Sequence, residues 1–93
     1  MKYLVIIEKG ENNYSAYSPD VLGCVATGKT IELTLGNMKD ALSLHLEDVI
    51  ENGESIPLPK SLNYYLENTN EISDDEIITH INIEIPELAL GTC

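Results

Sequence analysis

The chain has 93 residues, with 16 Asp and Glu against five Lys and no Arg, so its formal net charge is −11 at pH 7. This length is enough for one domain with a modest core, and a hydrophobic content of 43% excludes a disordered tail. A surface this acidic repels phosphate groups, so we expect no direct binding of RNA or DNA, and either attraction to a basic partner or simple solubility.

Three strands are predicted first along the chain. Residues 3–7 form a continuous apolar run that is typical of a buried, central strand. A turn over residues 9–13 leads into a second strand over residues 14–18, which pairs back as a hairpin. The segment 23–28 has glycine at each end and predicts a short third strand.

The longest periodic segment predicts a helix over residues 31–52. Thr30 is a suitable N-cap, Glu32 lies in the favourable first turn, and Gly53 follows the end. Apolar side chains recur at helical spacing, namely Ile31, Leu35, Met38, Leu42, Leu46, Val49 and Ile50. This stripe requires cover from one face of the sheet. Gly36 inside the helix costs about 1 kcal/mol relative to Ala, and we expect it to permit close approach to the sheet.

The rest of the chain predicts one more strand. Alternate prolines make residues 56–59 extended, Ser61 is suited to cap a short helix, and residues 68–76 form a polar acidic loop. Residues 78–85 then alternate, which places Thr79, Ile81, Ile83 and Ile85 on one face and His80, Asn82 and Glu84 on the other. The predicted fold class is therefore α+β, a single domain over residues 1–93 with one long helix across a sheet face.

Several short motifs follow one another in a recognisable order. They are Asn-Tyr-Ser-Ala-Tyr at 13–17, Pro-Asp-Val-Leu-Gly-Cys at 19–24, Gly-Lys-Thr at 28–30 and Ile-Pro-Leu-Pro at 56–59, with the helix end at 41–47. Together they resemble the HicB family, the antitoxins of bacterial toxin–antitoxin pairs, over nearly the whole chain.

This resemblance implies a β-β-β-α-β domain with a partial ribonuclease H-like fold. It also implies that the chain neutralises a small basic HicA-type toxin that cleaves RNA, and that it forms dimers or higher homo-oligomers. Glu-Leu-Thr at 32–34 departs from the Glu-Glu-Ala usual in the family, which bears on local helix packing. Many members continue into a DNA-binding domain, whereas this sequence stops at Cys93, so we expect a short form without that activity.

A ribonuclease H-like outline raises the question of nuclease activity. Two-metal hydrolysis needs clustered carboxylates, one of them in the middle of the first strand, but that strand is apolar and Glu8 stands at its end. The other candidates come from a loop, a helix and a distant strand, namely Asp20, Glu32, Asp40 and Glu84. We therefore predict no metal site, no cofactor and no enzymatic activity.

The loop at residues 23–30 and the two histidines are expected to have no catalytic or nucleotide-binding role. Residues 23–30 match the spacing of a phosphate-binding loop, but a Pro-Asp loop precedes them instead of a hydrophobic strand, so we expect no nucleotide site. His45 is expected to be partly buried beside the apolar stripe and His80 to be exposed, and neither accompanies a nucleophile motif.

The cysteines and the N-terminus indicate a cytoplasmic protein. Cys24 and Cys93 form neither a CxxC pair nor a His/Cys cluster, and we expect no disulfide between them. The first eight residues contain one Lys and a five-residue apolar run, which is too short for a signal peptide or a membrane span.

Candidate partner-binding residues lie on the hairpin and the loop after it. Glu8, Glu11 and Asp20 are predicted to steer a basic partner. Tyr14 and Tyr17 lie three apart on a strand and so point to opposite faces, and one of them is predicted to be an exposed apolar anchor. Two alternatives stay open: a stand-alone oligomeric module that acts as a scaffold or small-ligand binder, and a hydrolase with a degenerate nuclease site.

Overall fold

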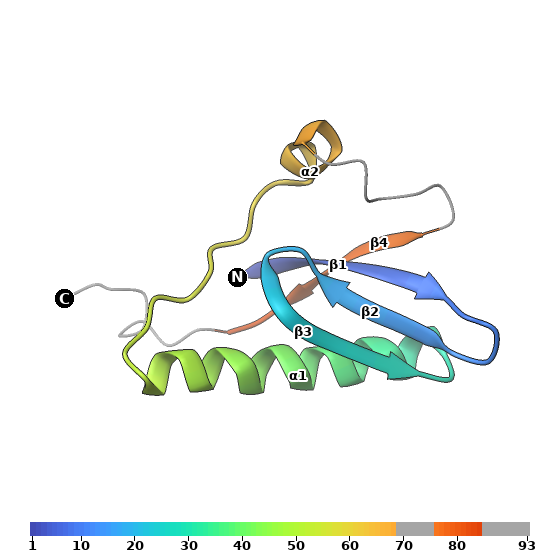
Figure 1. The fold of residues 1–93 in the computed structure, drawn as a ribbon, viewed down its shortest axis with the longest axis horizontal. Helices are drawn as coiled ribbons and strands as arrows, with labels where there is room; N and C mark the ends of the chain where they lie inside the picture. Colours follow the sequence, from blue (N-terminus) through green and yellow to red (C-terminus); the bar gives the residue numbers. More distant parts are fainter. Residues whose placement is uncertain (69–75, 85–93) are drawn as a thin grey trace.

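The computed structural model describes residues 1–68 and 76–84 (Figure 1). The elements in chain order are β1 (Lys2–Lys9), β2 (Tyr14–Ser18), β3 (Val21–Gly28), α1 (Ile31–Glu51), α2 (Leu62–Asn68) and β4 (Ile77–Asn82). The four strands form one antiparallel sheet in the order β3-β2-β1-β4. The predicted α+β fold with one long helix is confirmed, and most of the predicted loop over residues 68–76 lies outside the described residues.

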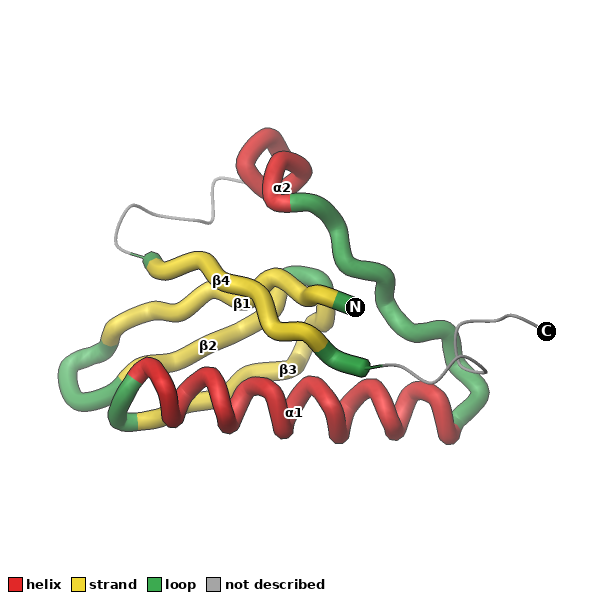
Figure 2. The backbone as a smooth tube through the Cα atoms, turned by 180° about the vertical axis from the view of Figure 1, so that it is seen from behind, coloured by secondary structure: helices red, strands yellow, loops and turns green. Residues whose placement is uncertain are grey.

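β1 is the central strand, as its apolar run predicts. β2 pairs with one of its edges and β4 with the other, and all five residues from Tyr3 to Ile7 are at most 1% exposed. Alternation along the strand turns Tyr3, Val5 and Ile7 toward α1 and the residues between them toward the opposite face. Figure 2 shows α1 along one side of the sheet and α2 beyond the other side.

α1 packs its apolar stripe mainly onto β3 and, less extensively, onto β2. Met38, Leu42 and Leu46 are fully buried at the centre of the stripe, and the other predicted members are partly buried at its edges. The predicted N-cap is confirmed, because the Thr30 hydroxyl accepts a hydrogen bond from the backbone N–H of Leu33 at 3.0 Å. The helix ends one residue earlier than predicted, with residue 52 as its C-cap.

Gly28, and not Gly36, is the glycine at which helix and sheet approach closely. A Cβ atom at Gly28 would lie 2.7 Å from the backbone nitrogen of Thr34 and 2.8 Å from its Oγ1, whereas a Cβ atom at Gly36 would meet nothing within 4 Å. The prediction for Gly36 is therefore wrong. Gly36 lies on an exposed side of α1, while Gly28 ends β3 directly against the first turn of the helix.

Asp20, in the turn between β2 and β3, holds the segment after α1 against the sheet. Its Oδ1 accepts a hydrogen bond from the backbone N–H of Lys60 at 3.1 Å and another from the Tyr65 hydroxyl. Residues 54–61, which we call the strap, are also tied to β1, because the Tyr3 hydroxyl donates to the carbonyl of Pro57 at 2.7 Å. Ser61 caps α2 as predicted, since its hydroxyl accepts from the N–H of Tyr64 at 3.1 Å.

The edge strands differ from prediction in their bounds. β3 begins at residue 21 instead of 23, because Ser18 pairs with Val21 while Tyr17 pairs with Val25, and the residues between Val21 and Val25 bulge out of the ladder. β4 spans residues 77–82 instead of 78–85, and position 85 lies outside the described residues. The alternation is confirmed up to position 84, with buried Ile81 and Ile83 and with exposed His80, Asn82 and Glu84.

Candidate partner interface

The three carboxylates predicted to steer a partner do not gather in one place. Glu8 ends β1 opposite Ser15, and Glu11 is exposed in the turn that follows. Asp20 lies beyond the other end of β2, in the turn that follows Ser18. Asp20 is also half-buried and already accepts two hydrogen bonds within the chain. Its structural role is therefore clear, and a steering role for Glu8 and Glu11 stays a prediction.

The two candidate tyrosines lie on opposite faces of the sheet, as predicted from their spacing. Tyr14 packs against the core beneath α1, and Tyr17 lies on the other face, between Ile6 and Val25 on the neighbouring strands. Both are half-buried, so the expectation that one would be exposed is wrong. Tyr17 has a paired residue on each neighbouring strand and Tyr14 packs against the core, and the sequence of one strand could show neither.

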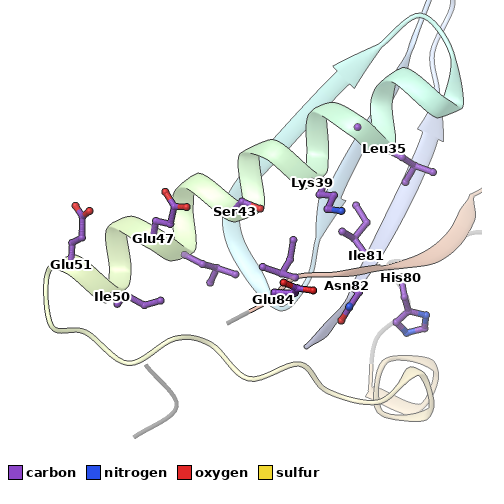
Figure 3. Close-up of a pocket in the computed structure, with 13 residues that line it drawn as sticks. Leu35, Lys39, Ser43, Glu47, Ile50, Glu51, His80, Ile81, Asn82 and Glu84 are labelled. Carbon is purple, nitrogen blue, oxygen red and sulfur yellow. The ribbon is translucent and has the colours of Figure 1, made fainter. Parts of the chain in front are cut away.

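A groove of about 810 Å³ lies between α1 and β4 (Figure 3). It exists because α1 leans toward β3 and β2, so that residues 1–68 and 76–84 leave the β4 half of the same sheet face partly uncovered. Its floor is apolar and consists of Leu35, Leu46, Ile50, Ile81 and Ile83. Its rim is polar and includes Lys39, Glu47, Glu51, His80, Asn82 and Glu84. We call this feature the α1–β4 groove.

The charged groups of the α1–β4 groove are predominantly acidic. Three rim carboxylates and one ammonium leave a formal charge of −2 when His80 is neutral, and all of these side chains are exposed. Two of the carboxylates, Glu47 and Glu51, are four residues apart near the C-terminal end of α1, whose last turn has no basic residue. The sequence did not single out these residues, although the spacing of acidic side chains at a helix C-terminus was a signal that could have done so.

No cluster of metal ligands is found in the described residues. Nowhere in residues 1–68 and 76–84 do three His, Cys, Asp or Glu side chains come close enough together to hold a metal ion. The residues that match a phosphate-binding loop have structural roles, since Gly28 abuts Thr34 and the Thr30 hydroxyl caps α1.

The remaining candidate residues are a histidine on α1 and the two cysteines. His45 is exposed, which corrects the expectation of partial burial. Cys24 is a buried free thiol, and burial raises its pKa, while Cys93 lies outside the described residues. In the part of the chain that the structure describes, no helix combines the length and hydropathy that a membrane crossing requires.

Similarity to solved structures defines the class of protein. The N-terminal domain of the Burkholderia pseudomallei antitoxin HicB shares this fold with a TM-score of 0.79 and 23% identity, over 91% of this chain and 100% of that one. A chain of the HicA3 and HicB3 toxin-antitoxin complex gives a TM-score of 0.73 and 26% identity, over 91% and 100%. The sheet order, the single long helix and these similarities define a small α+β module with the fold of a HicB antitoxin N-terminal domain.

The family follows from the sequence itself. The model of the HicB-like antitoxins of bacterial toxin–antitoxin systems matches residues 3–91, and the chain belongs to this family. A 14.9 kDa protein from the rep-hol intergenic region of Haemophilus phage HP1 is 34% identical over 97% of this chain and 77% of its own length. A UPF0150 protein of Helicobacter pylori is 48% identical over 47% of this chain and 61% of its own length. The predicted family is confirmed, and so is the prediction of a non-enzymatic protein, because this is a family of antitoxins.

Proposed function

We propose that this chain binds a small basic HicA-type toxin and neutralises its RNA-cleaving activity. The observation that carries the proposal is the family match over residues 3–91. It is supported by the similarity to a chain of the HicA3 and HicB3 complex, and by the net charge of −11, which favours encounter with a basic protein. Neutralisation is by occlusion: the antitoxin covers the toxin surface that RNA needs. The chain acts in the cytoplasm, and alone it binds neither nucleic acid nor membrane.

Co-expression with the small basic gene that we expect beside this one tests this proposal. The neighbouring protein is expected to arrest growth when expressed alone, and this chain is expected to restore growth and to co-purify with it. A toxic neighbour that is neither bound nor neutralised would contradict the proposal and would favour the alternative of a stand-alone scaffold or small-ligand binder. A gel shift with the promoter DNA is expected to show no complex with this chain alone.

A homo-oligomer is the second part of the proposed function. β3 is an edge strand, and its exposed side chains Leu22, Val25 and Thr27 carry no charge, so a second copy can approach there without bringing carboxylates together. Leu22 and Val25 are 85% and 61% exposed, which is unusual for large apolar side chains on a strand. Light scattering is expected to give a dimer or a multiple of it, and Val25→Lys is expected to shift it toward the 10.3 kDa monomer. A wild-type chain that is monomeric at tens of micromolar would contradict this part.

A further inference from the structure

We propose that the α1–β4 groove is the surface that receives the toxin, and that its occupant is a toxin segment with Lys or Arg side chains around an apolar anchor. The inference rests on the proposed function, since it names where the toxin binds. It moves the main contact away from the hairpin residues, because Glu8 and Asp20 lie far apart and Tyr14 and Tyr17 are half-buried.

The size and lining of the groove suit a protein segment. Its volume of about 810 Å³ leaves room for side chains of a partner. The floor contains the partly buried Leu35 and Ile50, and the β4 residues beside them are apolar as well. In the described residues β4 pairs only with β1, so the groove lies next to the unpaired edge of a sheet. An apolar side chain of a partner can therefore reach the floor while its backbone lies along that edge.

Gly36 is a second observation that points to an approaching partner. A glycine inside a helix is unfavourable relative to Ala, and at Gly36 no described neighbour within the chain requires it, since a Cβ atom would meet nothing within 4 Å. Gly36 lines the α1–β4 groove. The missing side chain at this point widens the groove and lets the backbone of a partner come close to α1. Gly36 therefore serves the binding of a partner and not packing within the chain.

The charges select the occupant. Glu47 and Glu51 repel each other at a spacing of four residues, and Glu51 lies in the last turn at the negative end of the helix dipole, so both charges disfavour the isolated helix. Glu84, just after β4, lies on the other side of the groove (Figure 3), and the three carboxylates make the rim acidic, which favours the approach of a Lys or Arg side chain. A second copy of this chain brings its own charge of −11, and nucleic acid brings phosphates, so neither is suited to this acidic rim. A basic protein segment is suited to it, because its charges are opposite to those of the rim.

Matched variants of the full chain test the assignment by binding to the purified toxin. Glu47→Lys is expected to weaken binding about tenfold or more, because it removes a contact and adds a repulsion. Asp48→Lys is the control: it makes the same change in charge at the adjacent exposed position, outside the groove, and is expected to change affinity about threefold or less. Gly36→Gln is expected to weaken binding by filling the groove while leaving the urea midpoint unchanged or higher, since Gln is a better helix former. His45→Gln, at another exposed position of α1 outside the groove, is its control.

The outcomes separate the two proposals. If the wild-type chain binds no toxin, the proposed function fails, and this surface assignment fails with it. If the wild-type chain binds and the Glu47 and Gly36 variants bind equally well, the toxin sits elsewhere and only the groove assignment is overturned. Equal losses for Glu47→Lys and Asp48→Lys would mean general electrostatic attraction, which also overturns it. Dissociation of a homo-oligomer by Gly36→Gln, with toxin binding intact, would identify a second copy as the occupant and overturn the choice of partner.

Discussion

The same substitution, Gly→Ala, is expected to have opposite effects on stability at Gly28 and Gly36. At Gly28 the new Cβ atom would lie 2.7 Å from the nitrogen of Thr34 and 3.0 Å from the carbonyl carbon of Leu33. Both atoms belong to the helix backbone, so the first turn of α1 must move away from β3. Overpacking of this kind destabilises the folded state by about 1–3 kcal/mol. The lower conformational entropy of the unfolded alanine variant stabilises the fold by only about 0.4–1 kcal/mol. We expect a net destabilisation of about 1–2 kcal/mol.

Gly36 is the control for Gly28. Its Cβ atom would project into open space, so Gly36→Ala is expected to gain up to about 1 kcal/mol from helix propensity alone. Urea unfolding at one fixed protein concentration measures both variants. With a slope of about 1 kcal/mol/M for a chain of this size, the midpoint is expected to fall by about 1–2 M for Gly28→Ala and to rise by up to about 1 M for Gly36→Ala. Equal shifts, or a stabilised Gly28 variant, would refute the close approach at the start of α1.

Three further expectations follow from burial and hydrogen bonding. Tyr65→Phe is expected to lower the unfolding free energy by about 1–3 kcal/mol, because it removes a hydrogen bond from the partly buried carboxylate of Asp20. Burial, and then the hydrogen bond to Asp20, raise the pKa of Tyr65 in the folded chain. The contribution of Tyr65 to the unfolding free energy is therefore complete below the unfolded pKa of about 10 and is lost as the pH rises above it. A wild-type chain that is as stable at pH 11 as at pH 8 would contradict this expectation. Leu42→Ala is expected to lower the unfolding free energy measured by calorimetry by about 2–5 kcal/mol. Leu44 is 68% exposed, so Leu44→Ala is expected to lower it by about 0.5 kcal/mol or less. Similar losses of stability for the two variants would argue against the assigned helix face.

The parts of the fold that depend on local sequence could be predicted. The apolar run of β1, the stripe of α1 and the caps Thr30 and Ser61 are each encoded within a few residues. The central position of β1 in the sheet then follows, because a strand with apolar residues on both faces is typical of the middle of a sheet, where both faces are covered. The bulge in β3 was missed, since residues 22–24 leave the ladder only because of how Tyr17 and Ser18 pair with that strand.

The candidate interface depends on placement that local patterns do not encode. Asp20 was predicted to be a steering residue, but its hydrogen-bond partners lie 40 and 45 residues farther along the chain and could not be identified from its own segment. The α1–β4 groove results from α1 leaning toward β3, which no periodicity reveals. The role of Gly36 was misread for the same reason: the sequence shows that a glycine is present, but not whether the space beside it belongs to the sheet or to the groove.

Inhibition of the toxin's ribonuclease activity is the most direct test of the central claim that this chain is a neutralising antitoxin. The proposed HicA-type toxin, purified as the product of a small basic gene expected beside this one, would be titrated with the purified chain while cleavage of an RNA substrate is followed. Cleavage is expected to fall in proportion to added chain and to stop near equimolar protomers, with a residual rate that rises at high salt as exposed charges are screened. Undiminished cleavage at a large molar excess of the folded chain, at low salt, would contradict the account.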